Sequence, residues 1–177
     1  NVQNGPRKDS VNLIVVSDHG MTMVTPERKI ECRKYLKPYW FDRIEGNLPA
    51  QIYCKKQYID SVYNALKDIP HQRVWRRNEI PAYLHYDSNK NIGDVVVSPD
   101  EGWLVYDQEV TTGGMHGYDP EYSDMHAIFR AMGPDFKKTE IPHFRNVDIY
   151  DLMCHLLNIT PAKNDGNLEE IKSILKN

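Results

Sequence analysis

The sequence predicts an α/β protein in which a small α+β subdomain is inserted into a larger, sheet-containing core. Two apolar segments, residues 11–16 and 126–131, have the composition of buried strands and lie about a hundred residues apart. Between them, strand-like and helix-like segments follow in the order β-α-β-β-β, which is typical of a self-contained α+β unit. We therefore expect the two apolar segments to share one sheet, with residues 29–106 forming a separate lobe.

The first apolar segment is rich in β-branched residues, which is typical of a strand covered on both faces, as in a parallel sheet. Asp18 and His19 follow it, and open α/β sheets bind ligands at this end of their strands. Both side chains are metal ligands, and Gly20 gives the backbone freedom to turn both toward one ion. A turn cap at Asp18 with an ordinary hydrogen bond at His19 fits the pair equally well.

The inserted segment carries its own alternation of strands and a helix. Apolar residues recur at helical spacing in its helix, and a Pro-Asp-Glu-Gly turn joins its last two strands. A cluster of arginines, Arg73, Arg76 and Arg77, is either a phosphate-binding group or a solvated strand face. The expected elements are a strand at 49–54, a helix at 58–67, and strands at 74–75, 92–97 and 103–106.

A glycine-rich loop precedes the second apolar segment. His116 lies in this loop between glycines on both sides, which let the backbone approach a ligand closely. His116 is therefore a candidate metal ligand, whereas we expect His126 to be a core histidine inside the following strand. Residues 147–157 predict a helix with a broad apolar face, and residues 168–175 predict a short last helix.

Composition excludes several classes of protein. The chain has 177 residues, of which 40% are hydrophobic and 27% charged, with a net charge of −3, so nothing indicates binding to nucleic acid. No apolar run has the length of a membrane span. The three cysteines form no CxxC pair, which excludes a zinc knuckle. The chain starts without Met or a signal peptide, and we expect it to be a C-terminal fragment.

The candidate ligands Asp18, His19 and His116 supply the oxygen and nitrogen atoms that Zn²⁺ accepts. They are spread widely along the sequence, whereas structural zinc modules use short local spacings. This spread favours a catalytic zinc site.

Four segments resemble the nucleotide pyrophosphatase/phosphodiesterase (type I phosphodiesterase) family of the alkaline phosphatase superfamily. They are SDHGM at 17–21, IGDVVVSPDEGW at 92–103, GGMHGYD at 113–119 and AIFRAMGPDFK at 127–137. SDHG alone occurs across the superfamily, but SDHGM followed by HGYD is more specific. The resemblance implies the C-terminal part of an alkaline-phosphatase-like three-layer α/β/α catalytic domain. Residues 1–28 and 107–177 would belong to this core and residues 29–106 to the insertion, with the N-terminal half absent.

The resemblance also implies an activity: hydrolysis of phosphodiester or pyrophosphate bonds in nucleotides or related molecules, with two zinc ions, outside the cell or in the periplasm. Asp18 and His19 would bind the zinc ion that also binds the nucleophile, and His116 the second ion. The nucleophile, a threonine that becomes phosphorylated, would lie in the absent half. We therefore expect no catalytic nucleophile in this chain and no activity from it alone; the residues that bind substrate stay unassigned.

One residue departs from the family pattern, since Pro120 stands where the family usually has Asn after HGYD. This change affects the outer hydrogen bonds of the loop rather than the His116 ligand.

Two alternatives to this function stay open. One is a related hydrolase or transferase acting on phosphomonoesters, sulfate esters or phosphoethanolamine lipids, and the other is an inactive family member that acts as a binding protein.

Overall fold

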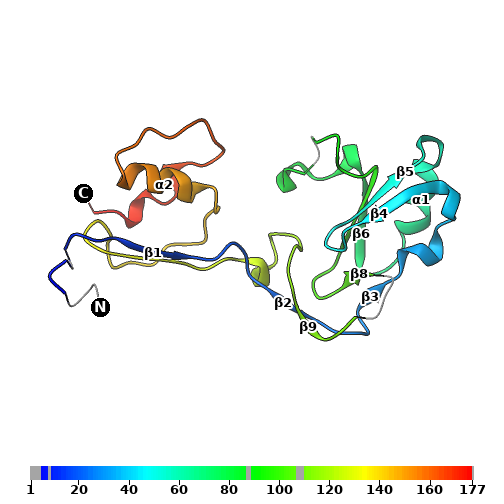
Figure 1. Cartoon of the computed structure of the whole chain (residues 1–177), viewed down its shortest axis with the longest axis horizontal. Coiled ribbons are helices and arrows are strands. Elements are labelled where there is room, and N and C mark those ends of the chain that lie inside the picture. Colours follow the sequence, from blue (N-terminus) through cyan, green and yellow to red (C-terminus); the bar gives the residue numbers. More distant parts are fainter. Residues whose placement is uncertain (1–4, 8, 87–88, 107–109, 177) are drawn as a thin grey trace. The chain divides into compact units, whose positions relative to one another are not determined.

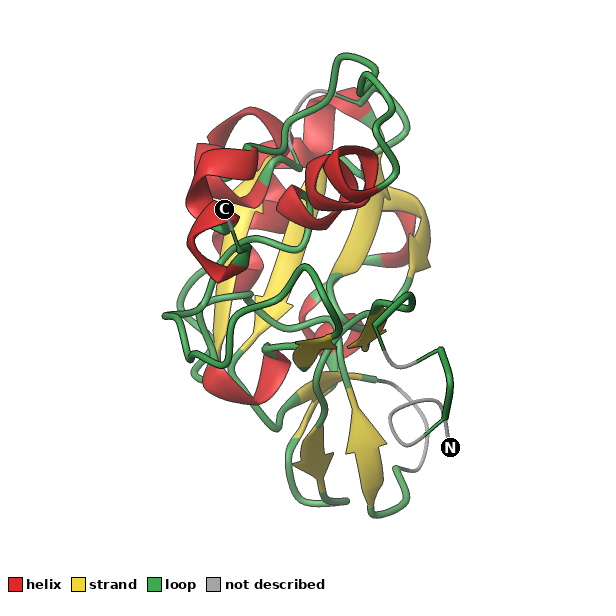
Figure 2. Ribbon diagram, turned by 90° about the vertical axis from the view of Figure 1, so that its left-hand side faces the viewer, coloured by secondary structure: helices red, strands yellow, loops and turns green. Residues whose placement is uncertain are grey.

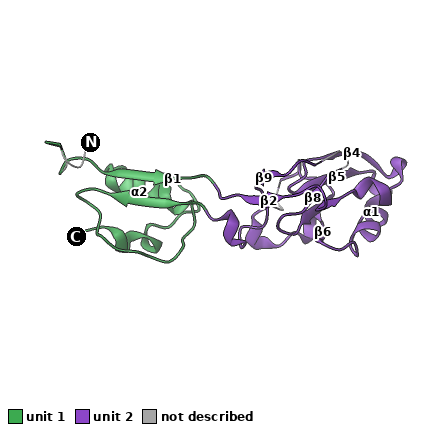
Figure 3. Ribbon diagram, turned by 90° about the horizontal axis from the view of Figure 1, so that it is seen from below, with its two compact units in different colours: residues 1–18, 127–177 green, residues 19–126 purple. Residues whose placement is uncertain are grey.

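The structure, a computed structural model, describes residues 5–7, 9–86, 89–106 and 110–176 (Figure 1). It divides into two compact units, shown in different colours in Figure 3. Unit 1 consists of Asn1–Asp18 and Ala127–Asn177, and unit 2 of His19–His126. The predicted insertion, residues 29–106, falls within unit 2, while the predicted start of the second core segment at residue 107 lies outside the described residues. No described helix is long and apolar enough to cross a membrane.

The described residues of unit 1 form two strands and one regular helix. Strand β1 (Leu13–Val16) pairs antiparallel with strand β10 (Phe129–Met132). Helix α2 (Asp148–Leu156) follows, and the short 3₁₀ helices η8 (Leu168–Glu170) and η9 (Lys172–Ile174) end the described chain. The buried core of this unit consists of Phe136, Leu152, Ile171, Ile174 and Leu175.

The pairing of β1 with β10 confirms that the two apolar segments share a sheet, but the expected burial on both faces is wrong for this chain. Ile14 packs against the core, whereas Leu13 and Val15, on the opposite face, are 52% and 46% exposed. The helices of unit 1 cover one face of the pair only. A β-branched run predicts a strand, yet it carries no information on the direction of its partner or on what covers its second face.

The expectation that His126 is a core residue inside the second strand is also wrong. The strand begins at Phe129, and His126 is an exposed residue at the end of the 3₁₀ helix η7 (Ser123–Met125). The buried residue at this point is Met125, so the strand pattern was extended too far toward the N-terminus.

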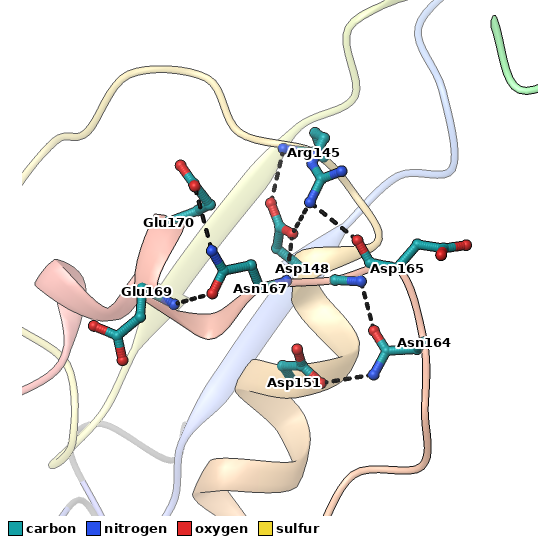
Figure 4. A network of polar contacts seen from close by, with 9 residues as sticks. Arg145, Asp148, Asp151, Asn164, Asp165, Asn167, Glu169 and Glu170 are labelled. Carbon is teal, nitrogen blue, oxygen red and sulfur yellow. Dashed lines mark hydrogen bonds and ion pairs between the residues drawn. The ribbon is translucent and has the colours of Figure 1, made fainter. Parts of the chain in front are cut away.

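A polar network fastens the segment after α2 to the start of that helix (Figure 4). The carboxylate of Asp148 is fully buried and accepts hydrogen bonds from the main-chain N–H of Arg145 (3.2 Å) and of Asn167 (2.9 Å), and from the Arg145 guanidinium (3.2 Å). The guanidinium also donates to the Asp165 carbonyl (3.0 Å), and the Asn164 amide donates to Asp151 (3.0 Å). These bonds connect the loop to the first turn of α2.

Unit 2 contains a four-stranded antiparallel sheet, whose strands and neighbouring helices are distinguished by colour in Figure 2. The strand order is β4-β5-β7-β6. The bounds are Phe41–Glu45 for β4, Ala50–Cys54 for β5, Gln72–Arg76 for β6 and Val95–Pro99 for β7.

Helix α1 (Ile59–Leu66) packs on one face of this sheet. Val62 and Leu66 of α1 are fully buried in the same cluster as Val95 and Val97 of β7. Val96, on the other face, belongs to a second buried cluster. Strand β7 is therefore covered on both faces, which explains its continuous apolar run.

Two smaller strand pairs complete unit 2. Strand β2 (Thr22–Val24) pairs antiparallel with β9 (Gly113–Met115), and β3 (Lys29–Ile30) pairs parallel with β8 (Leu104–Val105). The remaining short 3₁₀ helices are η2 (Cys32–Tyr35), η3 (Pro38–Trp40), η4 (Lys56–Tyr58), η5 (Arg77–Glu79) and η6 (Ala82–Leu84). The sequence correctly predicted α1 and the positions of β5, β6, β7 and β8. It missed β4, whose apolar and polar residues do not alternate clearly, and the short strands β2, β3 and β9.

Candidate metal centre

His19 lies in the short turn between β1 and β2. The main-chain N–H of Gly20 donates to the carbonyl of Met125 (3.0 Å), which holds this turn against the η7 segment. A Cβ atom at position 20 would collide with the carbonyl oxygen of Asp124. Glycine is therefore required here because the two backbones approach closely, and its effect is steric rather than a matter of turn flexibility.

His116 reaches the same place from a distant part of the sequence. It directly follows β9, and the register of the β2–β9 pair sets Thr22 opposite Met115. An antiparallel pair brings the residue before one strand next to the residue after the other. This register sets His116 opposite Met21, two residues after His19. The imidazole rings of His19 and His116 stack, with centroids 3.6 Å apart and planes at 15°.

A hydrogen bond fixes the tautomer of His19. Its Nδ1 lies 2.7 Å from the carbonyl oxygen of Gly20. Because a carbonyl can only accept, Nδ1 carries the hydrogen and Nε2 has the lone pair that a metal ion requires. Histidine ligands of metal ions are commonly oriented in this way, by a hydrogen bond from the second ring nitrogen.

The residues after His116 hold its loop in unit 2. Gly117 has φ 103°, and a Cβ atom there would lie 2.6 Å from the carbonyl oxygen of Leu48. Tyr118 is buried in the cluster that contains Val24 and Leu104, and burial raises the pKa of its hydroxyl to about 12. The loop therefore has one fixed backbone contact and one apolar anchor next to His116.

Asp119 is a buried carboxylate in the same loop, with 4% of its surface exposed. It accepts hydrogen bonds from the Tyr83 hydroxyl (2.5 Å) and from the main-chain N–H of Glu121 (3.0 Å), and its Oδ2 lies 2.9 Å from Nη1 of Arg73. Burial raises the pKa of Asp119, but these two hydrogen bonds and the charge of Arg73 outweigh burial, so the pKa lies below its ordinary value.

The arginine cluster is explained by ion pairs. Arg73 pairs with Asp119, Arg76 with Asp60 and Glu79, and Arg77 with Asp94. These contacts support the reading as a strand face over the phosphate reading. Sequence reasoning did not select Asp119 or Tyr83, and it selected Arg73 only as a member of the arginine cluster. The available signal was an acidic residue within the glycine-rich histidine loop.

The structure thus brings His19 and His116 together, while Asp18 is exposed and is the last residue of the first segment of unit 1. Among the described residues, no group of three or more His, Cys, Asp or Glu side chains is placed to hold one metal ion. Carboxylate oxygens and imidazole nitrogens are nevertheless ligand types that zinc accepts.

Comparison with known proteins agrees with these motifs. Residues 2–119 match the family described as type I phosphodiesterase / nucleotide pyrophosphatase. Solved structures of human ectonucleotide pyrophosphatase/phosphodiesterase 5 share the fold, with a TM-score of 0.90 and 34% identity over 99% of this chain and 48% of that chain. An inactive variant of the murine protein in complex with AMP gives a TM-score of 0.88 at 35% identity.

The chain is therefore a mixed α/β protein that corresponds to part of the catalytic domain of such enzymes. It belongs to the type I phosphodiesterase/nucleotide pyrophosphatase family. Family member 5 from Homo sapiens is 37% identical over 94% of this chain and 36% of its own length. The bis(5'-adenosyl)-triphosphatase of Xenopus laevis is 35% identical over 96% of this chain and 38% of its own length. The chain spans less than half the length of these relatives.

Proposed function

We propose that this chain is part of a zinc-dependent phosphodiesterase or nucleotide pyrophosphatase, in which Asp18 and His19 hold one zinc ion and His116 holds a second. The stacked pair of His19 and His116 carries this proposal, because it joins the SDHGM and HGYD motifs in space. Family membership supports the reaction class. The AMP complex of the murine relative supports a nucleotide as substrate.

Each residue has a defined part in this proposal. When bound, two zinc ions stabilise negative charge on the phosphoryl oxygens and favour deprotonation of the attacking hydroxyl. The hydrogen bond from His19 to Gly20 keeps the ring in the tautomer that can bind metal. The β2–β9 pair holds His116 beside it before any ligand arrives. The hydroxyl itself would belong to a threonine outside this chain, which forms a covalent phospho-enzyme.

We also propose that residues 1–28 and 107–177 belong to a three-layer core that an N-terminal half completes, with residues 29–106 as the insertion. Support comes from the exposed apolar face of β1, where Leu13 and Val15 are 52% and 46% exposed. Further support comes from the solved structures, since this chain matches 48% of their length. Relatives named as ectonucleotide enzymes and venom phosphodiesterases support an extracellular location.

The test uses the full-length protein, assayed with zinc on a p-nitrophenyl nucleotide ester, together with the 177-residue chain alone. We expect activity from the full-length protein, no activity from the chain alone, and a loss of about 100-fold or more in His116→Ala. His155→Ala is the matched control, because His155 is an exposed histidine on α2. Zinc content, measured by elemental analysis, should be two ions per protein and fall in His116→Ala only.

The outcomes separate the alternatives. Zinc binding with hydrolysis only of phosphomonoesters, sulfate esters or phosphoethanolamine lipids would assign the protein to another branch of the superfamily. A protein that binds nucleotide without hydrolysing any ester would be an inactive binding protein. Activity in the 177-residue chain that His116→Ala removes would place the nucleophile in this chain and refute the proposed division.

A further inference from the structure

Asp119 is one of two charged residues that are buried in the described part of the chain, the other being Asp148. A buried carboxylate is unfavourable unless hydrogen bonds and opposite charge compensate for the lost water. Three groups do so here, and two of them, Arg73 and Tyr83, come from outside the loop. The loop contributes the third, the main-chain N–H of Glu121.

The two outside groups belong to the segment with the four-stranded sheet. Arg73 lies on β6, which pairs with β7 along its whole length, and its guanidinium also lies over the ring of Trp75, 5.6 Å from the centroid. Tyr83 lies on the 3₁₀ helix η6. Neither residue belongs to β2, β9 or the histidine turn, so Asp119 connects the sheet to the loop that carries His116.

The connection lies three residues after His116, and its geometry restricts the loop. Asp119 is held through both oxygens: Oδ2 faces Arg73 and Tyr83, and Oδ1 accepts from Glu121. Gly117 and the buried Tyr118 connect this carboxylate to the His116 backbone, and the close approach of Gly117 to the Leu48 carbonyl restricts the connection. A shift of Asp119 would therefore move His116 relative to the ring of His19.

We propose that Arg73 and Tyr83 are positioning residues that act through Asp119 to keep His116 stacked on His19, so that the inserted sheet determines the geometry of the metal loop. The role of His116 toward zinc rests on the proposed function, whereas the position of its ring does not. The proposal assigns to the segment 29–106 a part in building the metal centre. Under this proposal, the side chain of Asp119 contacts neither substrate nor metal.

The chain offers a matched pair of variants. Tyr83→Phe removes one hydroxyl that donates to Asp119, whereas Tyr118→Phe removes a buried hydroxyl of the same loop that lies by the backbone of Gly102. Both changes keep the ring and its packing. Asp119→Asn adds a third variant, which keeps the shape of the side chain but removes its charge and one acceptor site.

The first readout needs no metal. In the full-length protein labelled at histidine, the imidazole signals of His19 and His116 are assigned by His→Gln variants. We expect Tyr83→Phe and Asp119→Asn to shift or broaden both signals, because each ring lies in the ring current of the other at 3.6 Å. Tyr118→Phe should leave them in place. Tryptophan fluorescence in each variant checks that unit 2 stays folded.

The second readout is zinc affinity, which we expect to fall about tenfold in Tyr83→Phe and Asp119→Asn, as is usual when a group behind a metal ligand is lost. Unchanged histidine signals in both variants would overturn the proposal, and so would equal effects of Tyr83→Phe and Tyr118→Phe. If His116→Ala leaves zinc binding unaltered, the proposed function fails, while the imidazole signals still decide whether Asp119 positions the ring.

Discussion

Replacement of the buried Asp148 by alanine should destabilise unit 1 selectively. The carboxylate is fully buried and accepts main-chain hydrogen bonds from Arg145 and Asn167 (Figure 4). Alanine leaves both N–H groups without this acceptor, at about 1–3 kcal/mol each. The ion pair with Arg145 adds less than about 1 kcal/mol, because the Arg145 side chain is 57% exposed. We therefore expect a loss of about 2–6 kcal/mol in the free energy of unfolding.

The distribution of tryptophans makes this effect measurable for one unit at a time. Trp40, Trp75 and Trp103, the three tryptophans of the sequence, all lie in unit 2. Urea unfolding followed by tryptophan fluorescence should therefore stay unchanged in Asp148→Ala. Native-state hydrogen exchange at the amides of α2 reports unit 1, and it should become faster by a factor that corresponds to the lost free energy.

Asp151→Ala is the control for this prediction. Asp151 lies on the same helix and accepts a single side-chain hydrogen bond from Asn164, so we expect a loss below about 1 kcal/mol. A loss of less than about 1 kcal/mol in Asp148→Ala as well would refute the reasoning. It would show that water replaces the carboxylate at both main-chain donors.

Three further predictions concern unit 2. Gly117→Ala should lower the free energy of unfolding, measured by urea titration, by at least about 1 kcal/mol. The reason is that φ at this position is 103° and that the new Cβ would meet the Leu48 carbonyl. A neutral effect would show that the loop adjusts. Cys54 should react slowly with Ellman's reagent at pH 8, since burial and the nearby Asp94 and Asp42 raise its pKa to about 12; rapid reaction in the folded protein would contradict this. Because the folded-state pKa of Asp119 is lowered, its stabilising contribution is present above the ordinary carboxyl value of 3.8 and is lost as the pH falls through the lower folded value. Acid titrations of unit 2 followed by tryptophan fluorescence should accordingly become less steep in Asp119→Asn between the ordinary value and the lowered folded value. An unchanged slope in that range would contradict the contribution.

The sequence alone determined the features that depend on local pattern. The helical spacing of apolar residues predicted α1, and the apolar run at residues 92–97 predicted β7, because side-chain periodicity follows directly from backbone geometry. The motifs SDHGM and HGYD indicated the family, which residues 2–119 match. His19 and His116 could be selected as candidate metal ligands from the sequence alone, because both the residue type and the neighbouring glycines are visible there.

The tertiary structure decided everything that depends on partners distant in sequence. It paired β1 antiparallel with β10 and left one face of β1 exposed, which a β-branched run cannot specify. It paired β2 with β9, the strand that directly precedes His116, and it stacked the rings of His19 and His116. The structure also placed Arg73 and Tyr83 against Asp119, a contact for which no spacing in the sequence gives a signal. Such contacts depend on chain topology. A buried charge requires hydrogen bonds or an opposite charge nearby, and the groups that supply them can come from any part of the sequence.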